Sequence, residues 1–226
     1  TSRKLMQKLD NSLADLPGLI YLEDVAKDIS GIHKIRALLK ARFLPARWLM
    51  PRRSVNDVAA VLFSSGSTGE PKGVLLTHYN LLSNIQSLQQ LFNFASDDVL
   101  CGSLPFFHAF GFSVTIWLPP VLGVGVAYHP NPLEAGRIGK MVEERKCTFL
   151  IATPTFLLGY IRKVEKEQFE SLRFVVTGAE KLQPRIAAAF QEKFDIEPLE
   201  GYGATELSPV AGLNIRNVEA GGIEQL

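Results

Sequence analysis

Cysteine is scarce in this chain, which has only two among its 226 residues. Two cysteines cannot supply the disulfide framework on which small secreted domains depend, so Cys101 and Cys147 are predicted to be buried thiols in a reducing compartment. The chain also lacks any run of about 18 or more apolar residues, which a membrane-spanning helix needs. The formal net charge is only +1, which gives no argument for a nucleic-acid partner.

What remains is the composition of an ordinary globular protein, with 46% hydrophobic and 21% charged residues. The length suffices for one large domain or two small ones. The chain begins TSRKLMQKLD, without an initiator methionine or the apolar core of a signal peptide. It ends GGIEQL, without an evident closure of the fold. We expect a segment of a longer protein that resides in the cytoplasm.

The first predicted region, residues 1–55, combines a basic helix with a linker, and the second, residues 56–226, carries a regular pattern of elements. Between residues 34 and 53 there is no acidic side chain, apolar side chains are interspersed, and the basic residues are Lys34, Arg36, Lys40, Arg42, Arg47, Arg52 and Arg53. Pro45 and Pro51 end any long helix here. Two interpretations stay open: the apolar side docks on its own domain, or the segment lies on an anionic membrane face.

The second region alternates short apolar runs with segments of helical period. Strands are predicted at residues 58–63, 74–76, 99–104, 124–128, 148–152, 173–177 and 198–201. Helices are predicted at 78–92 with Thr77 as N-cap, at 110–118 with a stop at Pro119-Pro120, and at 132–145, 154–166 and 184–194. This order predicts an α/β fold, in which a mostly parallel sheet is covered by helices on both faces and ligands bind at the carboxyl ends of the strands.

A glycine-rich loop, SSGSTGEPKG at residues 64–73, lies between the first two predicted strands. Glycines let backbone N–H groups approach an oxyanion, and hydroxyl groups add donors to phosphate oxygens. Lys72 supplies a mobile positive charge suited to a polyphosphate. The loop is not a Walker A motif, because it contains no Gly-Lys-Ser/Thr. We therefore predict a phosphate loop; a flexible serine-glycine linker is disfavoured by its position between two strands.

Three further clusters follow predicted strands. LPFFHAFG sets His108 between aromatic residues, where it either packs in the core or lines an apolar substrate tunnel. VTGAEK turns at Gly178, where the backbone can pass flat against a planar ligand. GYGATE offers Tyr202 for stacking on a base, Thr205 for a phosphate and Glu206 for Mg²⁺. A carboxylate there is also a common helix N-terminal charge.

In this order and spacing, SSGSTGEPKG, PFFHAFG, VTGAEK and GYGATE resemble the core motifs of the adenylate-forming superfamily. That superfamily includes acyl-CoA synthetases, acyl-[acyl-carrier-protein] synthetases, luciferases and peptide-synthetase adenylation domains. The amino-acid sequence around the motifs is most similar to the acyl-ACP synthetase region of bacterial bifunctional enzymes that also carry a 2-acylglycerophosphoethanolamine acyltransferase. The resemblance implies the N-terminal large-domain portion of the adenylate-forming fold, with residues 56–226 as an AMP-binding core that is incomplete at its C-terminus.

The resemblance also implies a role for each matching residue. The phosphates of ATP would be held by Ser65, Gly66, Ser67, Thr68, Gly69 and Lys72. Gly178, Ala179 and Glu180 would line the adenine, and Tyr202 would stack near it. His108 would sit near the acyl carboxylate, and Thr205 would contact the α-phosphate. Glu206 and Thr68 would hold Mg²⁺, and the implied catalytic set is Lys72, His108, Thr205 and Glu206.

The implied activity is that of an acid–thiol ligase. A fatty acid and ATP give an acyl-adenylate and pyrophosphate, and a thiol, from acyl carrier protein or coenzyme A, then takes the acyl group. The ribose-binding aspartate, the hinge and the catalytic lysine of the superfamily lie beyond the last match, so the chain by itself is expected to turn over poorly. For the full-length protein, the inner face of the bacterial membrane is an additional expected location.

Two alternatives to a fatty acyl substrate stay open. The first keeps the fold and changes the acid to an aryl or amino acid. The second is a non-catalytic nucleotide-binding module, against which the intact Lys72, His108 and Glu206 argue. The acyl chain length, the choice of thiol and the oligomeric state are not readable from the sequence.

Overall fold

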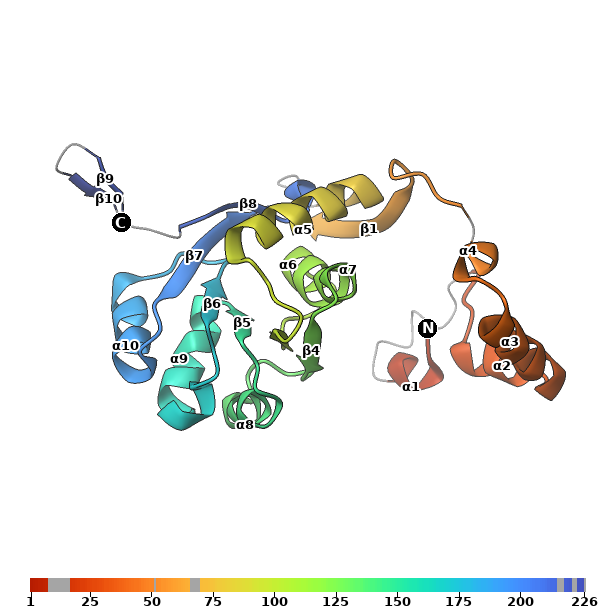
Figure 1. Ribbon diagram of the computed structural model, residues 1–226, viewed down its shortest axis with the longest axis horizontal. Helices are drawn as coiled ribbons and strands as arrows, with labels where there is room; N and C mark the ends of the chain where they lie inside the picture. Colours follow the sequence, from red (N-terminus) through yellow and green to blue (C-terminus); the bar gives the residue numbers. More distant parts are fainter. Residues whose placement is uncertain (8–16, 51, 66–69, 215–217, 221–222, 226) are drawn as a thin grey trace. The chain divides into compact units, whose positions relative to one another are not determined.

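The computed structural model describes residues 1–7, 17–50, 52–65, 70–214, 218–220 and 223–225 (Figure 1). The chain divides into two compact units, Thr1–Arg53 and Ser54–Leu226. Within the described residues, every helix is too short or too polar to span a bilayer.

The described residues of the first unit form four helices, α1 (Arg3–Met6), α2 (Leu22–Asp28), α3 (Gly31–Phe43) and α4 (Ala46–Leu49). Its α1 is tied to α2 by Arg3, whose guanidinium pairs with Asp24 and lies 4.2 Å from the centroid of the Tyr21 ring. None of these four helices contains a buried residue.

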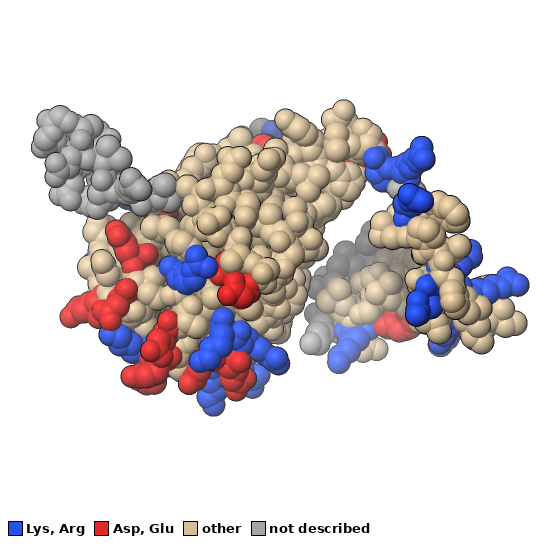
Figure 2. All heavy atoms as spheres, viewed as in Figure 1, with Lys and Arg blue, Asp and Glu red and all other residues tan. Residues whose placement is uncertain are grey.

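Helix α3 carries an exposed apolar stripe. Ile32, Ile35, Leu39 and Phe43 recur at the helical spacing that places them on one face, and they are 50% to 73% exposed. Basic side chains occupy much of the remaining surface of α3 and α4, and Figure 2 shows them gathered over these helices. The helix ends at Phe43 because Pro45 disfavours a helical conformation at Leu44, whose backbone is extended.

The second unit is built on a six-stranded sheet in the order β4-β3-β5-β6-β7-β8. The strands are β3 (Val99–Gly102), β4 (Gly125–Tyr128), β5 (Phe149–Ala152), β6 (Phe174–Thr177), β7 (Pro198–Gly203) and β8 (Val210–Leu213). Every neighbouring pair is parallel except β7 and β8, which are antiparallel. The predicted α/β fold with a mostly parallel sheet is confirmed.

Helices cover both faces of the sheet, as Figure 1 shows. On one face lie α8 (Ala135–Arg145), α9 (Pro154–Lys163), η3 (Lys166–Phe169) and α10 (Pro184–Phe194); on the other lie α5 (His78–Phe92), η2 (Phe112–Trp117) and α7 (Leu118–Leu122). Strand β5 serves both cores, because successive side chains point to opposite faces. Leu150 and Ala152 belong to the first core, and Phe149 and Ile151 to the second.

The two strands that flank the glycine loop are not part of this sheet. β1 (Val58–Ser65) and β2 (Pro71–Thr77) form an antiparallel hairpin of their own. β2 leads directly into α5, which begins as predicted at His78 with Thr77 as its N-cap. The cap is a reciprocal capping box, in which Thr77 and Asn80 each accept from the other's backbone N–H. A second small hairpin pairs β9 (Val218–Ala220) with β10 (Ile223–Gln225).

The prediction that Pro119-Pro120 stops the helix begun near Phe110 is wrong. Helical structure runs from α6 (Ala109–Gly111) through the π-helix η2 into α7, which contains both prolines in its first turn. A proline at position 119 donates no hydrogen bond to the carbonyl of Thr115, four residues earlier. That carbonyl accepts instead from the Tyr128 hydroxyl at 2.6 Å. The substitute donor from β4 satisfies the carbonyl that the proline leaves without a partner, which lowers the cost of continuing the helix.

A buried carboxylate fixes the start of β3. Asp98 accepts from Thr148 Oγ1 at 2.7 Å, from the N–H of Ala95 at 2.8 Å and from Arg173 Nη1 at 2.9 Å. Burial raises the pKa of the Asp98 carboxyl, but the hydrogen bonds from Thr148 and Ala95 and the charge of Arg173 lower it by more, so that the pKa lies below its usual value. The three partners precede β3, β5 and β6, so one side chain ties these starts together.

Both cysteines are buried and free, as predicted. Burial raises the pKa of the Cys147 thiol to about 11 and moves that of Cys101 further upward, with a smaller contribution from Cys147. Both thiols are therefore protonated and unreactive at neutral pH.

Candidate active site

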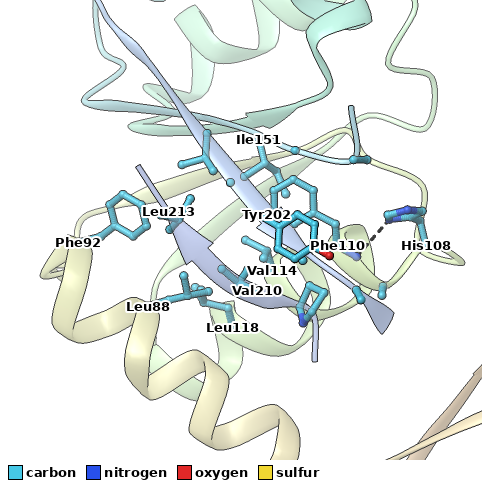
Figure 3. Close-up of a pocket in the computed structure, with 18 of the residues that line it drawn as sticks. Leu88, Phe92, His108, Phe110, Val114, Leu118, Ile151, Tyr202, Val210 and Leu213 are labelled. Carbon is cyan, nitrogen blue, oxygen red and sulfur yellow. Dashed lines mark hydrogen bonds between the residues drawn. The ribbon is translucent and has the colours of Figure 1, made fainter. Parts of the chain in front are cut away.

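The carboxyl ends of β5, β6 and β7 open on a cavity of about 230 Å³ (Figure 3). Five of the residues singled out in the sequence line it: His108, Gly178, Ala179, Tyr202 and Thr205. They come from three separate motifs that the parallel sheet brings to one edge. The remaining lining is almost entirely apolar.

His108 caps the short helix α6 and is exposed. Its Nδ1 accepts from the backbone N–H of Phe110 at 3.2 Å, the contact dashed in Figure 3. A neutral imidazole that accepts at Nδ1 carries its proton on Nε2. His108 therefore offers an Nε2–H donor beside the cavity, and it is not a packed core histidine.

The turn after β6 brings bare backbone to the cavity. A Cβ at Gly178 would lie 3.3 Å from the Phe110 ring, which is a tight contact, and 3.4 Å from the carbonyl oxygen of Gly201, which is an ordinary one. Ala179 has φ +69°, a left-handed conformation that costs a non-glycine residue roughly 1–2 kcal/mol. Backbone strain of this kind is concentrated at functional sites.

Glu180 is turned away from the main cavity. Its carboxylate accepts from Thr155 Oγ1 of α9 at 2.7 Å. It lines an adjoining depression that it shares with Ala179 and Tyr202. Its role beside an adenine stays a prediction.

Tyr202 stands at the mouth of the cavity. Its ring belongs to a side chain that is 75% exposed at the end of β7, and Figure 3 places it over the cavity beside Phe110. A large exposed aromatic ring at a sheet edge provides a stacking surface for a planar ligand. Thr205, in the short helix η4 (Thr205–Leu207), completes the polar side of the mouth.

Glu206 and Lys72 lie outside the cavity lining. Glu206 is an exposed residue of η4. Lys72 is an exposed residue of β2, and it lies opposite Ser64 of β1 in the register of the hairpin. The elements that carry them are in contact, since η4 packs against β2. The structure thus brings the glycine-loop hairpin up to the GYGATE segment.

Part of the predicted phosphate loop lies outside the described residues. These positions are Gly66, Ser67, Thr68 and Gly69, together with the side chain of Ser65, the residue that ends β1. Their roles toward phosphate, and that of Thr68 toward Mg²⁺, stay predictions.

Asn84, which positions part of the site without lining it, was missed by the sequence analysis. Its Nδ2 donates to the carbonyl oxygens of Val210, at 2.8 Å, and Leu207, at 3.3 Å. These bonds attach the segment that follows Glu206 to helix α5. The available signal was a polar residue within the apolar stripe Leu81–Ile85–Leu88, which is buried in the structure.

The apolar lining was also missed. It is contributed by Leu88, Phe92, Phe94, Val114, Leu118, Phe149, Ile151, Val176, Val210 and Leu213. In the sequence these side chains are indistinguishable from ordinary core residues, because nothing local marks which core position borders a void.

Comparison with known proteins places the chain in a family. Residues 17–223 match the family model described as AMP-binding enzyme. The chain is 38% identical over 161 residues to 4-coumarate–CoA ligase-like 9 of Arabidopsis thaliana, which covers 68% of this chain and 28% of that protein. It is 30% identical over 172 residues to the acyl-CoA ligase sidI of Aspergillus fumigatus, with 74% and 29% covered.

A solved structure gives the same picture. The crystal structure of ATP-bound MatB from Rhodopseudomonas palustris superimposes with a TM-score of 0.65 at 30% identity and covers 71% of this chain and 32% of that one. The chain spans about three tenths of the length of the curated relatives it matches.

Proposed function

Because this chain belongs to the AMP-binding, adenylate-forming enzyme family, we propose that it is the acid- and nucleotide-binding part of an ATP-dependent acid–thiol ligase. One observation carries the proposal. A single cavity joins an apolar interior to a mouth that holds His108, Tyr202 and Thr205. An acid with an apolar tail fits this division, with its carboxylate at the polar mouth.

The proposed nucleotide position follows from the same mouth. Tyr202 offers its ring to the adenine, Ala179 and Gly178 offer backbone groups that line the cavity, and Thr205 offers a hydroxyl to the α-phosphate. Lys72 and the glycine loop are proposed to hold the β- and γ-phosphates. The ATP-bound relative supports ATP as the nucleotide.

Magnesium fits this donor set if phosphates supply most of its ligands. Among the described residues no three His, Cys, Asp or Glu side chains gather into a metal site. Mg²⁺ in phosphate-transferring sites is held by one or two carboxylates, with phosphate and water oxygens completing the octahedron, and Glu206 supplies such a carboxylate. The bound ion would neutralise charge on the phosphates.

The proposed reaction has two balanced steps. In the first, a carboxylate oxygen of the acid attacks the α-phosphorus of ATP, the bond to the bridging oxygen breaks, and pyrophosphate leaves. In the second, the sulfur of a thiol attacks the acyl carbon, AMP leaves with the electron pair of the broken C–O bond, and the thiol proton passes to solvent. The contribution of this chain is to bring two anions into line at the mouth.

We propose a fatty acid as the substrate, with an aryl acid as the second candidate. The apolar lining supports the first, and the 4-coumarate–CoA ligase relatives support the second. The relatives favour coenzyme A as the thiol, whereas the amino-acid sequence around the motifs favours acyl carrier protein. To distinguish coenzyme A from acyl carrier protein, the protein is given a pre-formed acyl-adenylate with one thiol or the other, and thioester formation is measured.

For the basic first unit, we propose contact with an anionic lipid surface through α3. Its exposed stripe of Ile32, Ile35, Leu39 and Phe43 is flanked by Arg36 and Arg42, which is the arrangement that suits a lipid interface. Pelleting with phosphatidylglycerol vesicles but not with phosphatidylcholine vesicles is the expected result. Equal pelleting of the wild type and of Arg36→Glu/Arg42→Glu would contradict it.

The central experiment is acid-dependent ATP–pyrophosphate exchange, measured on the longest natural polypeptide that contains these residues. A fatty acid is expected to support exchange, and higher exchange with an aryl acid would favour the second candidate. Lys72→Ala and Glu206→Gln are expected to lower it by about 100-fold, the usual cost of removing a group that stabilises developing charge. Glu197→Gln, which alters an exposed carboxylate elsewhere in the unit, is the control. ATP binding without exchange for any acid would favour the non-catalytic module.

A further inference from the structure

The end of the cavity far from the mouth is closed by aromatic rings. Phe92 is the last residue of α5, Phe94 follows it, and Phe149 begins β5. All three line the cavity, and they are only 4%, 8% and 3% exposed. Figure 3 shows Phe92 on the side of the site opposite His108. We call Phe92, Phe94 and Phe149 the aromatic floor.

The aromatic floor is a packed unit. Phe92 lies 4.9 Å from Phe149 and 5.8 Å from Phe94, and Phe94 lies 5.0 Å from Phe149, measured between ring centroids. Phe174 of β6 backs it at 5.1 Å from Phe92. These separations are those of favourable edge-to-face and tilted ring pairs. A ligand that reaches the floor meets a surface that yields only at the cost of these contacts.

The floor and the walls next to it carry no hydrogen-bonding side chain. The walls are Leu88, Ile151 and Leu213, and the described cavity lining contains no Asp, Glu, Lys or Arg. A hydroxyl or charged group brought to this end would lose its water without gaining a partner. Such a loss lowers the affinity, by about 100-fold where a hydrophobic pocket meets an added hydroxyl and by more for a charged group.

On the basis of the proposed function, we infer that the site activates acids whose far end is apolar. Phe92 and Phe94 are the side chains that limit the length of these acids. Unsubstituted fatty acids and unsubstituted aryl acids share this chemistry. Acids with a hydroxyl, amino or second carboxyl group at the far end are used less efficiently.

The size of the cavity agrees with a limit on length. A dry cavity of about 150 Å³ holds a benzene ring, so about 230 Å³ holds one ring with a short linker or an alkyl chain of comparable volume. Longer acids enter only if the floor recedes.

The test compares matched acids in ATP–pyrophosphate exchange, again on the longest natural polypeptide. Cinnamate is paired with 4-coumarate, and octanoate with octanedioate. In each pair the apolar acid is expected to have a kcat/KM higher by roughly tenfold or more, and to give the larger rise in Tm when added with ATP. The cinnamate pair tests the preference among aryl acids, and the octanoate pair tests it among fatty acids.

The floor is tested with Phe92→Leu and Phe94→Ala. The first nearly conserves volume and is expected to fold, whereas the second opens more space at a greater risk to stability. Each is expected to raise kcat/KM for dodecanoate relative to octanoate, by about fourfold for every methylene newly accommodated. Phe190→Leu is the matched control, since Phe190 is fully buried in the core on the other face of the sheet, and it is expected to leave the length profile unchanged.

The outcomes separate the inference from its premise. If no acid supports exchange, the proposed function fails and the inference fails with it. If acids are activated but the polar member of each pair is used equally well, the substrate class is wrong. If the preference holds and neither folded floor variant shifts the length profile, Phe92 and Phe94 do not set the limit.

Discussion

Asn84 and Val210, which are 126 residues apart in the chain, exchange hydrogen bonds: the amide of Asn84 donates to Val210 O at 2.8 Å, and its Oδ1 accepts from Val210 N–H at 3.4 Å. Val210 begins β8 and lines the cavity. The contact therefore holds the wall next to Thr205 against α5. Asn84 is a positioning residue for the mouth and does not itself line it.

Replacing Asn84 by leucine is expected to raise the KM for ATP severalfold and to lower the free energy of unfolding by about 1 kcal/mol, because partly buried backbone groups lose their partners. Exchange kinetics and urea denaturation measure the two effects. Ser87→Ala is the control on the same helix, since the Ser87 hydroxyl is exposed and bonds only within α5. Unchanged ATP kinetics in a folded Asn84→Leu would show that the clamp does not position the mouth.

Two glycines of the β7–β8 hairpin are expected to respond differently to alanine. A Cβ at Gly203 would overlap the backbone carbonyl of Pro209, whereas a Cβ at Gly212 would meet nothing within 4 Å. Gly203→Ala is expected to cost about 1–3 kcal/mol through overpacking and to impair acid-dependent exchange. Gly212→Ala is expected to be near neutral. Thermal denaturation and exchange activity of the two variants, side by side, provide the check; equal behaviour would refute the prediction.

Asp98 is expected to make stability depend on acid pH. Its pKa is lower in the folded protein than in the unfolded chain, so the stabilisation is present above the unfolded value of about 3.9 and is lost as the pH falls through the folded value. Asp98→Asn is expected to lower the free energy of unfolding at pH 7 by about 2–3 kcal/mol and to flatten this acid limb. Urea titrations from pH 7 down to the acid transition measure it. Asp97→Asn, which changes the adjacent exposed carboxylate, is expected to do neither.

The two cysteines are expected to resist modification in the folded protein. Both are buried, and burial keeps them protonated at neutral pH, with the pKa of Cys147 raised to about 11. Ellman's reagent is expected to titrate neither thiol before unfolding and both in guanidinium chloride. Rapid reaction of the native protein at pH 7.5 would contradict the buried placement.

The elements whose signals are local were predictable from the sequence. Thr77 predicted the start of α5, because a capping box involves only residues within four positions of one another. Pro184 likewise predicted the first turn of α10. The helix through Pro119-Pro120 was not predictable, because the donor that replaces its missing hydrogen bond is the hydroxyl of Tyr128, which lies on strand β4. Local rules fail where a distant residue satisfies the local cost.

The candidate site divides in the same way. His108, Gly178, Tyr202 and Thr205 stand in recognisable motifs, and the parallel sheet brings them to one edge. Phe92 and Phe94 carry no such signal, because an aromatic residue at the end of an amphipathic helix has the same pattern whether it borders another side chain or a void. Glu180 shows the converse, since its motif was recognised but its carboxylate is held by Thr155 away from the cavity.

The core that contains the cavity is drawn from both ends of the second unit, from Ile85 and Leu88 of α5 to Val210 and Leu213 of β8. During synthesis the apolar face of α5 therefore leaves the ribosome long before the strand that completes its cover. Contacts between such distant segments form late, because the chain between them must first be closed into a loop. The binding cavity is thus complete only after β8 has joined the sheet, and a nascent chain halted before β8 would expose part of the apolar face of α5 to chaperones and to aggregation.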